Sequence, residues 1–281
     1  MKDFIEIFGN SEEIQKNTDR LIINDDVAKN RDLYLRKCVS FIDLTTLEGS
    51  DTFEKVGKLC EKGMKPSNDV GIHCAAICIY PRFIGFTKEK LKGSKVMAAT
   101  VATSFPAGQV PLELKLAEVK YCIEQGADEI DMVISRGEFL SGNFELVSEE
   151  IRKVKDICSA GDDVHLKVIL ETGELKTFDN IYKASVLAVE AGADFIKTST
   201  GKISPAATTG AAYIMLKTIK EHYIATGRKI GFKPAGGIRT SEEALQYVSL
   251  VKNIAGEEWL KPELFRIGAS SLLDNLLKDI G

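Results

Sequence analysis

Short runs rich in β-branched and aromatic residues alternate with longer amphipathic segments along most of this sequence. Eight runs are predicted as strands: residues 41–47, 72–80, 96–104, 129–135, 165–171, 195–200, 230–235 and 265–268. Helices are predicted between them, among them residues 52–62, 112–125, 144–160, 180–191, 210–225 and 241–255. Such alternation predicts a parallel sheet with helices outside it.

The length of the chain helps to decide between a closed and an open sheet. Eight strand–helix units within 281 residues match the size at which a parallel sheet closes into a barrel. An open, doubly wound sheet is the alternative, but no Gly-x-Gly-x-x-Gly follows the first strand. We predict an α/β fold, a TIM (β/α)8 barrel over residues 36–281, preceded by a helical extension over residues 1–35. A helix over residues 25–38, capped by Asn24 or Asp25, is predicted where the extension meets the barrel.

Charge and cysteine content exclude several classes of partner. The net charge is -4 and basic residues are interleaved with acidic ones, so nucleic acid is not expected to bind. No run approaches the length of a membrane span and the first 30 residues are polar, so we expect a cytoplasmic protein without a membrane partner. Six scattered cysteines and three histidines lack metal-ligand spacing, and we expect reduced thiols, no metal and no cofactor.

Charged residues occur inside several predicted strands. Because side chains alternate along a strand, Asp131, Lys167, Lys197 and Lys233 are predicted to face the barrel interior in one layer. The first two strands add Asp43 and Cys78. A single strand lysine is commonly an edge residue or an ion-pair partner, and Asp131 could simply pair with Lys167. Burying three lysines with two carboxylates is costly, however, and this favours a functional site.

The lysines suggest a covalent chemistry. An amine is nucleophilic only when neutral, which near pH 7 requires its pKa to fall by about 3 units from roughly 10.4. Burial and a neighbouring ammonium both lower the pKa. We predict that Lys197 attacks a carbonyl, that Lys233 stays cationic beside it, and that Asp131 moves protons. This is Schiff-base chemistry.

The loops after the last three strands are rich in groups that bind phosphate. Glycines let backbone N–H groups approach an anion, and a helix N-terminus adds its dipole. The loop residues are Thr200, Gly201 and Lys202, then Gly236, Gly237 and Arg239, then Gly268, Ser270 and Ser271. Each glycine could instead serve an ordinary turn, but barrel enzymes often bind phosphate after strands 7 and 8. A phosphorylated substrate is therefore expected.

At these residues the sequence resembles the deoxyribose-phosphate aldolase family. The similar stretches are FIDLTTL (41–47), AAICIYPRF (75–83), VATSFPAG (101–108), GADEIDMVI (126–134), LKVILETGEL (166–175), GADFIKTSTGK (192–202), GFKPAGGIRT (231–240) and FRIGASSLL (265–273). The longer N-terminal segment and residues 259–273 look like the eukaryotic branch.

The resemblance implies a reaction and a role for each residue. Lys197 matches the Schiff-base lysine, Lys233 the lysine that lowers its pKa, and Asp131 the acid/base group. Residues implied to contact substrate are Asp43, Cys78, Lys167, Thr200, Gly201, Lys202, Gly236, Gly237, Arg239, Gly268, Ser270 and Ser271. The implied reaction cleaves 2-deoxy-D-ribose 5-phosphate reversibly to acetaldehyde and D-glyceraldehyde 3-phosphate, in deoxyribonucleoside catabolism. A homodimer is expected from the resemblance.

Two departures from the family pattern are visible. Residues 205–208 read Pro-Ala-Ala-Thr where the family commonly has Asn-Ala-Thr, which bears on the hydrogen bonding of that loop. The tyrosine-ended tail of many bacterial relatives has no counterpart here, so we expect slower proton transfer or another group in its place. A phosphosugar isomerase, a different class I aldolase, and a binding or scaffold protein that has lost turnover are the alternative functions.

Overall fold

The computed structural model describes residues 8–67, 72–161 and 164–280. Its eight strands form one parallel sheet in the order β7-β6-β5-β4-β3-β2-β1-β8. The strands are β1 (Ile42–Thr45), β2 (Ala76–Ile79), β3 (Met97–Ala102), β4 (Glu129–Val133), β5 (His165–Ile169), β6 (Phe195–Lys197), β7 (Gly231–Lys233) and β8 (Ile267–Ala269). Parallel bridges from Phe232 to Phe265 and from Ala235 to Gly268 connect the two ends of the sheet, so that it nearly closes. The predicted TIM (β/α)8 barrel is confirmed.

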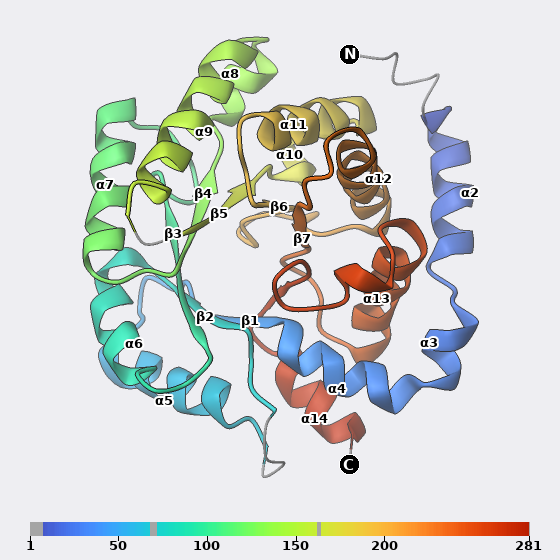
Figure 1. Cartoon of the computed structure of the whole chain (residues 1–281), viewed down its shortest axis with the longest axis horizontal. Helices are drawn as coiled ribbons and strands as arrows, with labels where there is room; N and C mark the ends of the chain where they lie inside the picture. Colours follow the sequence, from blue (N-terminus) through green and yellow to red (C-terminus); the bar gives the residue numbers. More distant parts are fainter. Residues whose placement is uncertain (1–7, 68–71, 162–163, 281) are drawn as a thin grey trace.

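Helices surround the strands on the outside (Figure 1). They are α5 (Phe53–Met64), α6 (Ile84–Lys90), α7 (Leu112–Glu124), α8 (Arg136–Leu140), α9 (Phe144–Cys158), α10 (Thr172–Leu175), α11 (Phe178–Glu190), α12 (Thr209–Thr226), α13 (Ser241–Ile254) and α14 (Leu272–Ile280). The short 3-10 helices η1 (Pro81–Phe83) and η2 (Glu257–Trp259) lie in the connections. No helix within the described residues is long and apolar enough to cross a membrane.

Within the described residues, the first strand is preceded by the helices α2 (Ser11–Leu21), α3 (Asp25–Lys29) and α4 (Arg31–Phe41). Helix α2 packs outside α12 and α13 (Figure 1). The single helix predicted over residues 25–38 is wrong, since Asn30 separates α3 from α4 and its side chain bonds back to Asp26. Asn24 does cap α3, as predicted. The division of the chain at residues 35 and 36 stays a prediction, and α4 runs across it.

Several predicted strands are longer than the observed ones. Phe41, predicted as the first residue of a strand, is the last residue of α4, which enters β1 directly. Residues 72–75 precede β2, and Cys74 N–H bonds Gly63 of α5 rather than a neighbouring strand. Residues 198–200 follow β6 as a loop. Apolar runs predict burial well, but strand ends depend on which partner receives each backbone hydrogen bond.

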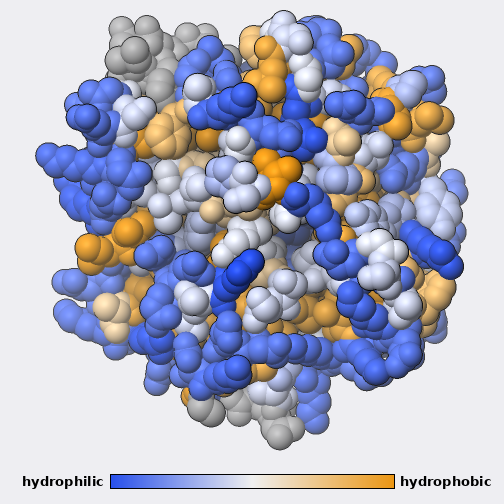
Figure 2. Space-filling model, turned by 180° about the vertical axis from the view of Figure 1, so that it is seen from behind, coloured by the Kyte–Doolittle hydropathy of each residue, from blue (hydrophilic) through white to orange (hydrophobic). Residues whose placement is uncertain are grey.

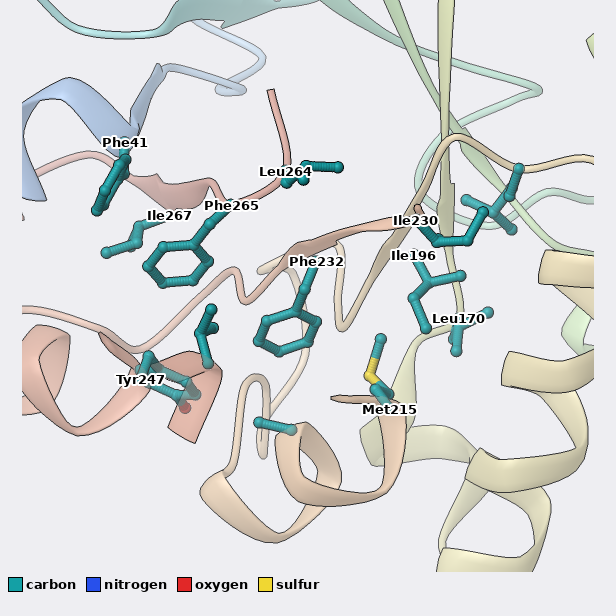
Figure 3. Packing of buried hydrophobic residues seen from close by; sticks show 14 of the residues in the cluster. Phe41, Leu170, Ile196, Met215, Ile230, Phe232, Tyr247, Leu264, Phe265 and Ile267 are labelled. Atoms are coloured by element: carbon teal, nitrogen blue, oxygen red, sulfur yellow. The ribbon is translucent and has the colours of Figure 1, made fainter. Parts of the chain in front are cut away.

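The main hydrophobic core lies between the strands and the helices. Near β7 and β8, the rings of Phe232 and Phe265 stack at 6.4 Å, and Phe41 lies 5.1 Å from Phe265 (Figure 3). Inside the barrel the apolar cluster is small: Leu47, Ala76, Cys78, Ala99 and Val101. Polar side chains cover much of the outer face in Figure 2, with hydrophobic residues scattered among them. The barrel interior therefore contains, besides this small cluster, the buried charged residues described next.

Candidate active site

The predicted charged layer is present inside the barrel. Asp131 on β4 lies opposite Lys167 on β5, and Lys197 on β6 lies opposite Lys233 on β7. Asp43 enters from β1, where its register partner on β8 is Gly268. A side chain at position 268 would approach Lys233 Cε to 3.3 Å and Ala235 Cβ to 2.8 Å. Glycine at 268 therefore leaves room for the lysine.

Asp131 is the centre of the cluster. Its Oδ2 accepts hydrogen bonds from Lys197 Nζ and Lys233 Nζ, each over 2.7 Å. Its Oδ1 accepts from Lys167 Nζ over 3.0 Å. All four side chains are buried. A single carboxylate thus contacts all three lysines that the sequence pattern placed in the barrel.

Two further carboxylates and an arginine complete the charged network. Lys233 Nζ lies 2.5 Å from Asp43 Oδ2, and Lys167 Nζ lies 2.5 Å from Glu129 Oε2. Arg266 donates to Asp43 Oδ1 and to Glu129 Oε1, each over 2.7 Å. Glu129 and Arg266 were not among the predicted site residues. Strand alternation could have indicated both of them. Glu129 lies two positions before Asp131, and Arg266 lies two positions before Gly268, so each shares a face with a predicted site residue.

The two neighbouring lysines have opposite pKa shifts. Burial lowers the pKa of Lys197, Asp131 opposes this, and the positive charge of Lys233 lowers it further, so that the pKa falls below its ordinary value. Burial also acts to lower the pKa of Lys233, but Asp131 and Asp43 outweigh it and the pKa rises. The arrangement keeps Lys233 cationic and favours a neutral amine on Lys197.

The carboxylates remain ionised. Burial acts to raise the pKa of Asp131, but Lys167, Lys197 and Lys233 together hold it well below its usual range. The pKa of Glu129 is likewise held well below its usual range, because Arg266 and Lys167 outweigh burial. Burial raises the pKa of the Cys78 thiol, whose Sγ lies 4.0 Å from Asp131 Oδ2. Asp131 is therefore an ionised hydrogen-bond acceptor, and Cys78 is a neutral thiol.

A cavity of about 480 Å³ opens above this cluster at the carboxyl ends of the strands. Lys197 lines it. Nine of the predicted substrate-binding residues line it too: Thr200, Gly201, Lys202, Gly236, Gly237, Arg239, Gly268, Ser270 and Ser271. Asp43, Cys78 and Lys167 are fully buried and are not among the lining residues. The structure therefore brings the predicted nucleophile and the predicted phosphate loops to one cavity.

The glycine loops pack closely along the cavity rim. Gly201, Gly236 and Gly237 have φ values of 77°, 83° and 85°, a conformation that favours glycine. A side chain at position 236 would come within 2.9 Å of Gly201 Cα and 2.8 Å of Ala206 Cβ. The departing sequence at 205–208 is accommodated, because Ala207 N–H bonds the Gly236 carbonyl over 3.2 Å. Two loops thus meet with their backbones nearly in contact.

Two rim residues are held by carboxylates that were not among the predicted site residues. Thr200 Oγ1 donates to Glu171 Oε2 over 2.5 Å, and Arg136 donates to the same oxygen over 3.2 Å. Lys202 Nζ lies 3.0 Å from Glu48 Oε1 across the cavity mouth. Both carboxylates come from loops, after β5 and β1. Glu171 was predicted within a strand that ends earlier in the structure, and nothing in the sequence pairs Glu48 with Lys202.

A nearly closed (β/α)8 barrel with a lysine and carboxylate cluster below a glycine-lined cavity defines a class of barrel enzymes that use an amine. Comparison with known proteins specifies the family: residues 37–278 match the model of the DeoC/LacD family aldolases, and the chain belongs to that family. The deoxyribose-phosphate aldolases of Homo sapiens and Mus musculus are each 48% identical to it over 259 residues, covering 88% of this chain and 80% of each relative. A solved structure, the tetrameric deoxyribose phosphate aldolase of Aeropyrum pernix, is 26% identical with a TM-score of 0.69, covering 92% of this chain and 98% of that one.

Proposed function

We propose that this aldolase cleaves 2-deoxy-D-ribose 5-phosphate reversibly to acetaldehyde and D-glyceraldehyde 3-phosphate through a Schiff base on Lys197. The observation that carries the proposal is the position of Lys197. Its amine is the only member of the lysine triad with Lys167 and Lys233 that lines the cavity, and it contacts Asp131 beside a cationic Lys233. The names of the human and mouse relatives support the same substrate.

The proposed reaction begins when the neutral amine of Lys197 adds to the C1 aldehyde of the open-chain sugar. Loss of water forms an iminium ion, which accepts the electron pair of the C2–C3 bond as the C3 hydroxyl loses its proton. Glyceraldehyde 3-phosphate leaves and an enamine remains on Lys197. Protonation of the enamine at C2, followed by addition of water to the iminium carbon, releases acetaldehyde and the free amine.

Asp131 and Lys233 are the proposed proton carriers. Asp131 is ionised and shares one oxygen between the two amines, so a proton taken up there is passed to Lys233 or Lys197 over 2.7 Å. The phosphate group is proposed to bind at the glycine loops, where Lys202, Arg239 and the serine hydroxyls surround the cavity. Binding energy at the phosphate would orient C1 toward Lys197.

The decisive experiment measures glyceraldehyde 3-phosphate release from deoxyribose 5-phosphate by the native chain and by Lys197→Leu. We expect the variant to lose turnover while its circular dichroism spectrum and melting curve stay close to those of the native chain. Lys58→Leu is the control, because Lys58 lies exposed on α5 and pairs only with Glu54 among the ion pairs described. Equal rates for Lys197→Leu and the native chain would refute the proposal.

Borohydride reduction separates the aldolase from an isomerase and from a binding protein. An isomerase or a binding protein leaves no reduced adduct, whereas the proposed aldolase leaves an added two-carbon group on Lys197 when acetaldehyde and borohydride are present. Peptide mass spectrometry locates the adduct. An adduct elsewhere, or none, would contradict the assignment of Lys197.

Oligomer and setting are also part of the proposal. A homodimer in the cytoplasm, acting in deoxyribonucleoside catabolism without a metal or cofactor, is what the family resemblance suggests, and the six unpaired cysteines suit a reducing compartment. Light scattering on the purified chain tests the dimer. A mass equal to four chains would contradict the dimer and would match the tetramer described for the Aeropyrum pernix relative.

A further inference from the structure

The buried network has an unequal number of acids and bases. Among the residues that the structure describes, the carboxylates inside the barrel are Asp43 from β1 and Glu129 and Asp131 from β4. The cationic groups that face them are Lys167 from β5, Lys197 from β6, Lys233 from β7 and Arg266 from the segment entering β8. The Cys78 thiol from β2 lies near Asp131, and the half-buried His165 lies at the edge beside Glu129. Cys78 is neutral. Three carboxylates therefore face four cationic groups when every lysine is protonated.

Arg266 holds a large share of the negative charge. Its guanidinium donates to Glu129 through two nitrogens, over 2.7 and 3.0 Å, and to Asp43 over 2.7 Å. It is only 3% exposed, and an arginine does not lose its proton in a protein. One of the three negative charges is thereby permanently compensated at the end of the network away from the cavity.

Lys167 and Lys233 compensate the other two. Lys167 lies between Glu129 and Asp131, and Lys233 lies between Asp131 and Asp43, so each contacts two carboxylates at 3.0 Å or less. Lys197 contacts Asp131 alone, on the oxygen that also accepts from Lys233. With three fixed cations and three carboxylates, a proton on Lys197 would leave one uncompensated positive charge in a buried site, which is costly.

We propose that Arg266 is a positioning residue for the reaction: by compensating Glu129 and Asp43 from below, it leaves Lys197 as the surplus base and so keeps that amine neutral and nucleophilic. This inference rests on the proposed function, because it assigns a cause to the reactivity of Lys197. Arg266 has no contact with the cavity and acts through the carboxylates. The direction of the Lys197 pKa, which burial lowers, agrees with it.

The test compares the acid limb of the pH profile of kcat/KM in charge variants. Arg266→Met removes a fixed cation, so Lys197 gains a carboxylate of its own and the limb moves to higher pH by about one unit or more. Glu129→Gln removes a carboxylate and moves the limb to lower pH. The double variant Arg266→Met/Glu129→Gln restores the balance and returns the limb toward the native position. Arg266→Lys keeps the charge and leaves the limb near that of the native chain.

Two control variants test whether the shift of the limb is specific to the charged network. Arg228→Met deletes a partly buried arginine that bonds the Val189 and Ala193 carbonyls outside the network, and it leaves the limb in place. His165→Gln is the second control: it removes a partly exposed imidazole whose pKa Glu129 raises, so the limb moves in the same direction as in Arg266→Met but by less. A limb that disappears, or that moves as far as in Arg266→Met, overturns the inference.

Adduct formation distinguishes failure of the inference from failure of the proposed function. The rate of cyanoborohydride trapping of acetaldehyde on Lys197 is followed by mass spectrometry across the same pH range for each variant. No adduct on native Lys197 at any pH refutes the proposed function. An adduct whose pH dependence is the same in the native chain, Arg266→Met and Glu129→Gln refutes the inference alone. If Arg266→Met does not fold, Glu129→Gln and the double variant must still differ in their limbs, and coincident limbs refute it.

Discussion

Lys197 and Lys233 donate to the same oxygen atom, Oδ2 of Asp131, and their pKa values shift in opposite directions. The difference arises from what else each lysine contacts. Lys233 also lies against Asp43, whereas Asp131 is the one carboxylate among the described residues that pairs with Lys197, which lines the cavity. Both lysines share Asp131, but Lys233 has a second carboxylate and stays cationic, whereas Lys197 on the adjacent strand has none within the described residues and is the reactive amine.

Replacing Lys233 with methionine removes the cation beside Lys197. The pKa of Lys197 is lowered in the native chain, so the neutral amine persists to a lower pH than for an ordinary lysine, and activity falls as pH drops through that pKa. Loss of Lys233 raises the pKa of Lys197, so the acid limb of kcat/KM should move to higher pH. We expect kcat at pH 7 to fall by roughly 100-fold or more. Steady-state kinetics from pH 5 to 9 measure both effects.

Lys229→Met is the matched control for this variant. Lys229 precedes β7, lies exposed at the surface and contacts the rings of Tyr223 and Trp259 rather than the charged network. Its loss should leave the pH profile unchanged. Coincident acid limbs in Lys233→Met and the native chain would show that the neighbouring cation does not tune Lys197.

Asp131→Asn should destabilise the fold and alter its acid sensitivity. The native pKa of Asp131 is well below its usual value, so its contribution to stability is present above the unfolded pKa, near 3.8, and is lost as pH falls through the folded pKa. Removing a carboxylate that contacts three buried lysines should lower the unfolding free energy by about 3–5 kcal/mol at pH 7. The difference from the native chain should shrink below pH 4. Urea titrations at pH 7 and at pH 3.5 measure it, and an equal difference at both would contradict the ionised state.

Strand alternation predicts which charged residues meet, because the register of a parallel barrel brings every second residue of neighbouring strands into one layer. Asp131, Lys167, Lys197 and Lys233 were predicted together on that ground, and the structure places them together. Arg266 was missed although it shares a face with Gly268, because a single arginine in a four-residue run carries little pattern. Glu48 was out of reach, since loop conformation rather than periodicity brings it to Lys202. Glu171 was predicted within the strand 165–171, on the face of Lys167, but it lies in the loop after β5 with a φ of 58° and accepts from Thr200 there.

The ends of the strands were predicted less well than their number and order. Phe41 looks like strand because it is buried and aromatic, yet helical hydrogen bonds continue through it to the first residue of β1. The eightfold alternation predicted the barrel because each unit repeats the same pattern, so that an error at one strand end leaves the count unchanged. Local ends depend on tertiary partners that a single sequence does not display.

Gly236→Ala should weaken phosphate binding. A side chain at 236 would meet Ala206 Cβ at 2.8 Å and Gly201 Cα at 2.9 Å, so the two rim loops must separate. We expect a rise of about tenfold in KM for deoxyribose 5-phosphate, with a loss of about 1–2 kcal/mol in stability from the φ of 83°. Gly227→Ala is the control, since its φ is 75° but nothing lies within 4 Å. It should lose similar stability with an unchanged KM, and a KM that rises equally in both variants would mean that strain alone is responsible.

Lys202 should contribute to affinity for the phosphate of the substrate rather than to the chemistry. Its amine lines the cavity and is paired with Glu48 over 3.0 Å, so the substrate phosphate competes with that carboxylate for the same cation. Lys202→Met should raise KM for deoxyribose 5-phosphate by about tenfold or more, the loss expected for a charged hydrogen bond. Unphosphorylated 2-deoxyribose should be cleaved equally by the variant and the native chain, which separates this role from catalysis.

Glu48→Gln is expected to act in the opposite direction. Without the competing carboxylate, Lys202 is free to bind phosphate, and KM for deoxyribose 5-phosphate should fall by at most about fivefold, since an exposed ion pair contributes about 1 kcal/mol or less. Inhibition by inorganic phosphate should strengthen by the same factor, and both gains should vanish in the double variant with Lys202→Met. Because the pair is solvent-exposed, raising the ionic strength should reduce the difference between Glu48→Gln and the native chain. A lower KM that persists after Lys202 is removed would mean that Glu48 repels the phosphate directly instead of occupying the lysine.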